Sequence, residues 1–489
     1  MPIRSISLKA CRLAIRGKIL LLLAQNMKTD DCYVIAGGGL AGLFAAKTLR
    51  ASGVKNIYII EKSDGVDGLL SSRSVSYDGA EYSFDAGTHF ILSTNDPDID
   101  ALMQQDLDGL DLREYRGSLF EGHAANGRLY QESGCVNLGL FSADVQNAVR
   151  AELEALTSSS SSDVSEQGKP SNLFEAFVSR YGRSAAAHIY GSIFEKITGQ
   201  DAKMVAPEME VLFVPPRLII ADREESVALK KKPEWDDRIA FADCLDGTSD
   251  VVKYYPKTGG IHEWPKVMAA NLEREGVQIL NNCSIQKVNA EGKVIRSVTL
   301  SNGEEIRCDH VVWTLPPALF GFCSDVELPM KRPVMRSVGV VNILTDRRPV
   351  ERPYWINIYD PDFQTFRVTL YGNFAPRQPH NGVYKITAEI INDGGFEGSE
   401  EEQKLVFEEL QKLSILPEDA QLLYSEANQK AEGFPVLTPD LLETSRQQVA
   451  LLEEGFDNLI LAGGLPDKGY GQVAAMRTAY FAIQESLKI

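Results

Sequence analysis

The sequence predicts an α/β fold that joins a discontinuous Rossmann-type domain to a mixed domain of helices and antiparallel strands. Residues 33–61 show the strand–helix–strand pattern that is typical of a parallel sheet. Between residues 96 and 250 this rhythm is lost and helical spacing dominates, whereas residues 336–391 contain longer alternating strands. A strand and a long helix in residues 458–489 return to the first pattern, so the first domain is expected to consist of separate segments.

The glycines within residues 33–61 carry the first functional signal. They follow the first strand at G-x-G-x-x-G spacing, and an acidic residue ends the second strand. Gly37 permits the tight turn, Gly39 lets the backbone approach a pyrophosphate, and Gly42 lets the helix pack on the strand. The helix N-terminus offers N–H groups to phosphates, and Glu61 can accept hydrogen bonds from a ribose. The alternative is a βαβ unit whose glycines serve packing only. The predicted dinucleotide contacts are Gly37, Gly39, Leu40, Ala41, Gly42, Glu61 and Lys62.

The composition argues against several classes of partner. The chain has 489 residues, more than one core usually organises, with 44% hydrophobic and 24% charged residues. Its formal net charge of -18 argues against nucleic acid and anionic membranes, because both select a basic surface. The seven cysteines and six histidines are scattered without metal-ligand spacing. We therefore expect a reducing, cytoplasmic location and no metal site.

Residues 1–27 form a basic N-terminal extension that is left out of the fold prediction. The stretch before Met27 contains five basic residues and no acidic residue. Its apolar run 19–24 is too short to span a bilayer, which needs about 20 residues, so no transmembrane segment is expected. Three interpretations stay open: a targeting segment, a disordered arm, or a start extended beyond a natural N-terminus at Met27, which we favour.

A second set of motifs follows the second strand. Gly65 and Gly68 indicate a flexible turn, residues 71–73 (SSR) follow it, and residues 85–90 (DAGTHF) indicate a tight turn before another apolar run. Together these motifs resemble the flavin-binding superfamily of monoamine oxidases, protoporphyrinogen oxidases, phytoene desaturases and UDP-galactopyranose mutases. One departure is Asp67, which stands where that superfamily usually has the first glycine of a Gly-Gly pair.

The resemblance implies FAD as the cofactor and a further set of contacts. In that superfamily the second glycine segment lies along the pyrophosphate, and the G-x-H segment lies near the isoalloxazine ring. The alternative for the histidine is a turn residue that is satisfied locally. The residues concerned are Gly68, Leu69, Ser72, Arg73, Thr88 and His89.

The middle of the chain is expected to contribute to both domains. Residues 96–249 look like a mostly helical insertion, in which the charged stretch 223–237 is expected to be a surface excursion. Residues 254–260 (YYPKTGG), followed by a helix over 262–275, resemble the segment with which the superfamily re-enters its cofactor domain. In the superfamily, the strand that holds Val288 touches the adenine through its backbone.

The strands within residues 336–391 are expected to form an antiparallel sheet, which in the superfamily is the floor of the substrate site. On that resemblance, Arg367 is positioned to bind a phosphate or carboxylate of the substrate; the alternative is a solvent-facing arginine. The predicted division is 1–27 for the extension, 28–95, 250–335 and 440–489 for the FAD-binding domain, and 96–249 and 336–439 for the substrate or cap domain.

The C-terminal segment resembles the last motif of the superfamily. Residues 458–464 (NLILAGG) indicate a strand that runs into glycines, and a glycine turn and a long helix follow. In the superfamily this helix directs its N-terminus at the flavin pyrimidine, where its dipole stabilises negative charge. Mutases need an arginine near Gly463-Gly464 that this chain lacks. The positions implied to contact the flavin are Gly463, Gly471, Gln472 and Val473.

Three functions remain open on the sequence. We rank first an FAD-dependent oxidoreductase, similar to amine oxidases and protoporphyrinogen oxidases, that transfers a hydride from a small organic substrate to flavin. The alternatives are a mutase-like flavoenzyme acting on a nucleotide sugar and a non-catalytic binding protein similar to GDP dissociation inhibitors. The expected partner is a small molecule, with anionic compounds and sugar nucleotides among the candidates, and the oligomeric state stays open. The predicted catalytic residues are His89, Arg367 and Tyr470.

Overall fold

The computed structural model describes residues 29–116, 121–158, 169–242, 252–375 and 381–488, so the predicted extension 1–27 lies outside the described residues. The first domain contains a five-stranded parallel sheet with the order β12-β2-β1-β16-β22. A parallel sheet that continues on both sides of its first strand has Rossmann-type topology and confirms the predicted fold class. The strands are β1 (Cys32–Ala36), β2 (Asn56–Ile60), β12 (Gln278–Leu280), β16 (His310–Trp313) and β22 (Leu459–Leu461).

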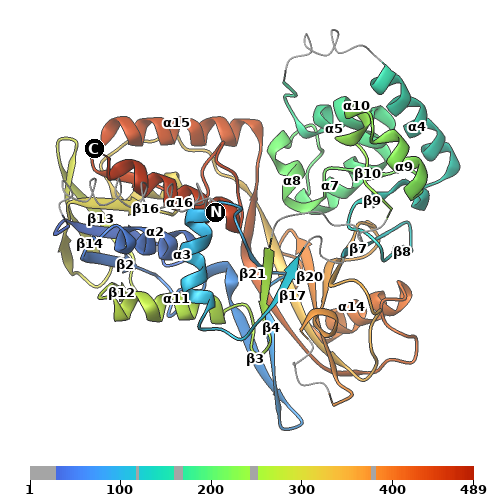
Figure 1. The fold of residues 1–489 in the computed structure, drawn as a ribbon, viewed down its shortest axis with the longest axis horizontal. Helices are drawn as coiled ribbons and strands as arrows, with labels where there is room; N and C mark the ends of the chain where they lie inside the picture. Colours follow the sequence, from blue (N-terminus) through green and yellow to red (C-terminus); the bar gives the residue numbers. More distant parts are fainter. Residues whose placement is uncertain (1–28, 117–120, 159–168, 243–251, 376–380, 489) are drawn as a thin grey trace, which may run out of the picture.

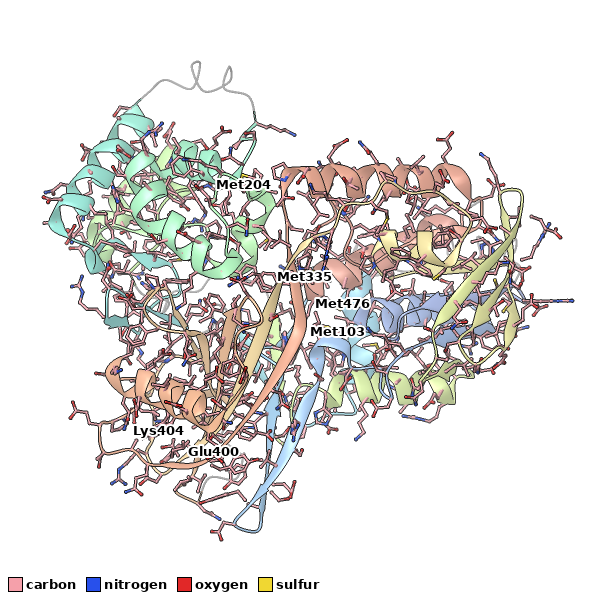
Figure 2. All side chains as sticks on the ribbon, turned by 180° about the vertical axis from the view of Figure 1, so that it is seen from behind. Met103, Met204, Met335, Glu400, Lys404 and Met476 are labelled. Atoms are coloured by element: carbon pink, nitrogen blue, oxygen red, sulfur yellow. The ribbon has the colours of Figure 1, made fainter. Side chains whose placement is uncertain are left out.

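Different elements cover the two faces of this sheet (Figure 1). The strands are apolar at successive positions, because both of their faces are buried. On one face Met103 and Met476 pack into the same core and lie close together (Figure 2). The helices of this face are α2 (Leu40–Ala51), α3 (Pro97–Leu107), α11 (Glu263–Arg274) and α16 (Gln472–Ser486). The other face packs against β13 (Ile285–Glu291), β14 (Val294–Leu300), β15 (Glu305–Arg307), α12 (Pro317–Cys323) and α15 (Pro439–Gly455).

A seven-stranded sheet with the order β21-β17-β20-β19-β18-β7-β8 forms the second layer of the molecule. Its side chains alternate, so that one face is apolar and packs on α14 (Glu400–Lys412), whose Glu400 and Lys404 point outward (Figure 2). The other face is polar and is turned toward the first domain and the helical cap. The strands are β7 (Glu121–Ala125), β8 (Arg128–Tyr130), β17 (Val334–Thr345), β18 (Trp355–Ile358), β19 (Thr365–Leu370), β20 (Tyr384–Asn392) and β21 (Leu422–Val436).

The helical cap lies beside these layers and has its own core (Figure 1). Within the insertion that was expected to be mostly helical, the chain changes direction between two helices at Gly182, where φ is +91°. The stretch 223–237, expected to be a surface excursion, is mostly exposed and contains two short helices, one capped by Asp222 and one begun by Pro233. The helices are α4 (Ala143–Ser158), α5 (Leu173–Tyr181), α6 (Arg183–Ala185), a π-helical turn η3 (Ala186–Tyr190), α7 (Gly191–Thr198), η4 (Pro207–Met209), α8 (Glu210–Phe213), α9 (Arg223–Leu229) and α10 (Pro233–Asp236).

Short elements connect the layers. Although α3 falls in the range predicted for the cap, it packs on α11 and α16; the domain boundaries themselves stay a prediction. Among the helices of the described residues, none is both long and apolar enough to cross a membrane. The connecting elements are η1 (Gly68–Leu70), the hairpin β3 (Ser72–Tyr77) and β4 (Ala80–Asp85), β5 (Ile91–Leu92), β6 (Leu112–Arg116), β9 (Val136–Asn137), η2 (Leu138–Leu140), β10 (Leu218–Ile219), β11 (Val252–Pro256) and α13 (Tyr371–Phe374).

Candidate active site

Two helix N-termini lie at the carboxyl edge of the parallel sheet. Because β1 and β22 run in the same direction, α2 and α16 both begin at this edge, and they pack side by side (Figure 1). Their N-cap residues are Gly39 and Gly471, and a Cβ added to either would meet no atom of the described residues within 4 Å. The space beside both N-cap glycines is therefore open, and a helix N-terminus with open space beside it suits phosphates and other acceptors.

Close packing explains two other glycines of the first turn. Gly37 has a φ of +99°, and a Cβ on Gly42 would overlap the carbonyl oxygen of Gly37. Glycine at position 42 therefore lets α2 begin directly against β1. Thr314, which follows β16, donates its hydroxyl to the carbonyl oxygen of Ala36 at 2.6 Å and packs against Gly37 of the same turn. In the first turn of α2, the side chains of Leu40 and Ala41 are partly exposed.

Glu61 is fixed at the end of β2 by two backbone donors. Its Oε2 accepts from the N–H of Gly38 at 2.7 Å, and its Oε1 accepts from the N–H of Ser63 at 2.8 Å. A carboxylate has about four acceptor sites, so two remain for the hydroxyls of a ribose. Lys62 is exposed beside it, whereas the side chain of Val288 is buried in the core under β13.

Asp85 connects the two motifs that follow in the sequence. Its carboxylate accepts hydrogen bonds from Ser72 Oγ (2.7 Å), Tyr255 Oη (2.6 Å) and the N–H of Ile261 (2.9 Å). A Cβ on Gly260 would lie 2.6 Å from Oδ1 of Asp85, so the second glycine of the YYPKTGG segment permits this approach. Ser72, predicted as a cofactor contact, is thus held by Asp85.

The second glycine turn touches the first, but its arginine is held by the seven-stranded sheet. A Cβ on Gly68 would lie 3.4 Å from the Cα of the N-cap glycine of α2, and the neighbouring Leu69 is 70% exposed. Arg73 contacts β21: its Nη2 lies 3.1 Å from Oε2 of Glu426, and its Nη1 donates to Asn428 at 3.0 Å. Arg73 therefore joins the cofactor domain to the sheet.

The turn of residues 87–89 lies against the polar face of the seven-stranded sheet. The N–H of Thr88 donates to Oε1 of Glu389 at 3.2 Å, and a Cβ on Gly87 would lie 3.3 Å from Oε2 of Glu389. Arg367 donates to the same carboxylate through Nε and Nη2, each at 2.7 Å. Burial raises the pKa of Glu389, but Arg367 outweighs this and, together with His89, holds the pKa below its usual value. Arg367 and His89 are therefore brought together around one carboxylate.

Alternate residues of β20 fix the main chain of β4, one of them directly and one through the hydroxyl of Tyr371. The Nζ of Lys385 donates to the carbonyl oxygen of Ser83 and lies 4.1 Å from the centroid of the Tyr371 ring. Thr387 contacts the hydroxyl of Tyr371 at 3.1 Å, and that hydroxyl accepts from the N–H of Asp85 at 2.9 Å. Burial lowers the pKa of Lys385 to about 7, against the opposite effect of Asp85.

The C-terminal motif closes the carboxyl edge. Gly463 has a φ of +88°, and a Cβ on it would lie 2.8 Å from the carbonyl oxygen of Thr314. At the start of α16, Oε1 of Gln472 is buried and has no hydrogen-bond partner among the described residues, while Val473 is partly exposed. An orphaned acceptor at an open helix N-terminus is a feature that a bound ligand would satisfy.

Tyr470 packs against a different group of residues. Its ring is partly buried against the core of the helical cap, and burial together with Glu208 and Asp467 raises its pKa. Asp467 is held by Arg446 through two hydrogen bonds of 2.7 and 2.8 Å. The C-terminal turn is therefore joined to the cap, and its predicted contact with the ring stays a prediction.

These observations fit FAD, which needs phosphate donors, a ribose acceptor and a second helix N-terminus within one extended groove. A model of the flavin containing amine oxidoreductase family matches residues 40–425. The chain belongs to this family. It is an FAD-dependent oxidoreductase, and the predictions of FAD as cofactor and of an oxidoreductase are confirmed.

Solved structures support the same fold. A reduced UDP-galactopyranose mutase aligns over 94% of both chains with 17% identity and a TM-score of 0.71. A putative protoporphyrinogen oxidase from an Exiguobacterium species aligns over 94% of this chain and 98% of its own, with 17% identity and a TM-score of 0.66. Cyclohexylamine oxidase from Brevibacterium oxydans aligns over 94% of this chain and 99% of its own, with 16% identity and a TM-score of 0.61. A search of curated proteins finds no match.

Several site residues were missed at the level of sequence. Asp85 lies within the motif of residues 85–90, yet two of its partners, Tyr255 and Ile261, are 170 and 176 residues away in the sequence. Lys385, Thr387 and Glu389 alternate with apolar residues, and this pattern signals a polar strand face without indicating what it contacts. Glu121 carries no sequence signal, because its strand is short and falls in a range predicted to be helical.

Proposed function

We propose that the chain oxidises a small organic substrate by hydride transfer, with the substrate bound between the cofactor domain and the polar face of the seven-stranded sheet. The observation that supports this most directly is the contact of the turn 87–89 with the Arg367–Glu389 pair. In related flavoproteins this turn lies near the isoalloxazine ring. When bound, FAD accepts the hydride and both electrons.

Within this proposal the residues of the polar face orient the substrate and exclude water. Arg367 is already paired with Glu389. We therefore propose that the two residues act together as a neutral pair, which fixes Thr88 and offers polar contacts to the substrate. His89 is placed to hold or pass a proton near neutral pH. Tyr470 is proposed to shape the apolar end of the site, where the C-terminal turn meets the cap.

The experiment that tests the function is a screen for flavin reduction. Purified holoprotein would be mixed anaerobically with panels of amines, alcohols and unsaturated compounds while the visible flavin band is recorded. We expect one class to bleach the band, and Arg367→Ala to slow the bleaching while FAD stays bound. If no panel member reduces the flavin and a nucleotide sugar is instead isomerised only by reduced enzyme, the proposal is replaced by the mutase alternative.

A second arginine outside the proposed site provides a control for Arg367→Ala. Arg348 lies outside the polar face and forms an exposed ion pair with Glu351. Arg348→Ala should therefore reduce at the rate of the parent, because exposed pairs of this kind contribute little. Equal rates for the parent and Arg367→Ala would remove Arg367 from the proposed site.

A further inference from the structure

Glu121 stands at one end of a row of side chains that crosses the polar face of the seven-stranded sheet. In the strand register Glu121 lies opposite Trp355, which lies opposite Thr369, which lies opposite Thr387. Side chains opposite each other on neighbouring strands lie on the same face. Glu121 therefore shares its face with the residues that contact the turn 87–89.

The carboxyl of Glu121 has an unusual environment for an acidic residue. It is partly accessible, yet burial raises its pKa to about 7, while Lys253 and Arg367 have the opposite, smaller effect. A Cβ added to Gly134 would overlap Oε2 of Glu121, so the main chain of that loop lies directly against the carboxyl. The carboxyl is therefore enclosed by protein and is still reached by solvent.

No hydrogen bond or ion pair to this carboxyl is found within the described segments. Arg367 is the nearby guanidinium, but its Nε and Nη2 both donate to Glu389. Buried carboxylates with a purely structural role are normally paired or hydrogen-bonded, because an unpaired one destabilises the fold. Glu389 follows that rule, and Glu121 departs from it.

We propose that Glu121 is a proton-accepting residue of the substrate site. The inference rests on the proposed function and specifies its substrate as a compound with an N–H or O–H on the reacting carbon, that is, an amine or an alcohol. The proton of that N–H or O–H passes to the carboxylate of Glu121, and a C=N or C=O bond forms. The hydride leaves the same carbon with both electrons for FAD, and Glu121 then returns its proton to water.

The charged and titratable groups around Glu121 set the direction of its pH dependence. Lys253 faces it from β11, Arg367 from β19, and the phenol of Tyr359 from the end of β18. The side chain of Glu132, by contrast, forms an exposed ion pair with Arg352. Since only the ionised carboxyl accepts a proton, kcat/KM should rise as pH increases through about 7.

The first test needs no substrate. Infrared difference spectra of the holoprotein between about pH 5.5 and about pH 8.5 would record the C=O band of protonated carboxyls. We expect the parent to lose a band with a midpoint near neutrality that Glu121→Gln lacks and the control Glu132→Gln keeps. The same titration in Glu121→Gln and in the parent would overturn the assignment. The visible flavin spectrum of each variant checks that it is folded and holds FAD.

The second test uses the amine or alcohol that the screen identifies. Glu121→Gln should lower kcat/KM by about 100-fold and abolish the rise near pH 7, because general bases typically contribute 10²–10⁴-fold. Lys253→Met should move the rise to higher pH, since Lys253 lowers the pKa of Glu121. Addition of formate to Glu121→Ala should restore part of the rate. Unchanged pH profiles in both variants would overturn this role while the oxidation itself stands; the absence of any reducing substrate would overturn the proposed function.

Discussion

The two main sheets of the molecule offer different parts of the chain to a ligand. At the carboxyl edge of the parallel sheet, open space lies beside the N-cap glycines Gly39 and Gly471, and a ligand there would meet main-chain groups. On the polar face of the seven-stranded sheet, a ligand would instead meet side chains such as that of Arg367, which is paired with the buried Glu389. The first surface depends on the absence of side chains and the second on their register. Substitutions should therefore act on the two surfaces in different ways.

The largest effect is expected on the side-chain surface. Arg367→Met leaves the Glu389 carboxylate buried without its cation, and loss of one partner of such a pair typically costs about 3–5 kcal/mol of unfolding free energy. The double variant Arg367→Met/Glu389→Leu removes the stranded charge and should be less destabilised than the single variant. Urea unfolding of the two proteins measures this. A double variant less stable than Arg367→Met would mean that the pair contributes mainly through hydrogen bonds to the turn 87–89.

A smaller effect is expected at the glycine turn, where two neighbouring glycines should separate stability from binding. Gly42→Ala places a Cβ against the carbonyl oxygen of Gly37 and should cost about 1–3 kcal/mol of unfolding free energy. Gly39→Ala meets open space at a φ of -69° and should leave the unfolding free energy of the apoprotein unchanged. It should still weaken FAD binding, because its methyl group lies where the phosphates are proposed to approach. Chemical unfolding of the apoproteins and FAD titration give the two readouts, and equal stability losses would contradict this distinction.

The contrast between the sheets also explains what the sequence could predict. The glycine spacing and Glu61 act within one βαβ unit, so their geometry follows from local sequence. Glu389 and Thr88 are 301 residues apart, and their contact depends on how two domains dock. Arg367 illustrates the limit: its strand was expected, but its pairing with Glu389 depends on the register of β19 with β20. Glu121 was missed because β7 joins a sheet whose other strands mostly come 200 residues later.

Glu61 is the one side chain of the parallel sheet that is proposed to bind FAD by its charge. Glu61→Ala should lose charge-assisted hydrogen bonds of about 1.5–3 kcal/mol and weaken FAD binding about tenfold or more. The carboxylate also accepts hydrogen bonds from the N–H groups of Gly38 and Ser63, so Glu61→Ala should also loosen the main chain at these two residues. Glu61→Gln keeps the shape and one acceptor oxygen, and should lie between the parent and Glu61→Ala. Equal FAD affinity in all three proteins, measured by equilibrium dialysis, would remove Glu61 from the cofactor site.

The smallest effect concerns Lys385, a buried lysine on the polar face of the seven-stranded sheet, and tests whether its buried charge destabilises the fold. Burial lowers its pKa to about 7, whereas an unfolded lysine titrates near 10.4. Between these values the unfolded chain binds more protons than the folded one, so the free energy of unfolding should rise with pH. Over about pH 7–9 the rise due to Lys385 should be on the order of 1–2 kcal/mol. Lys196, whose pKa burial lowers to about 8, contributes in the same direction. The quantity to measure is therefore the difference between the parent and Lys385→Met at each pH. That difference should change in favour of the parent as pH rises, and two parallel stability curves would show that Lys385 keeps an ordinary pKa beneath the Tyr371 ring.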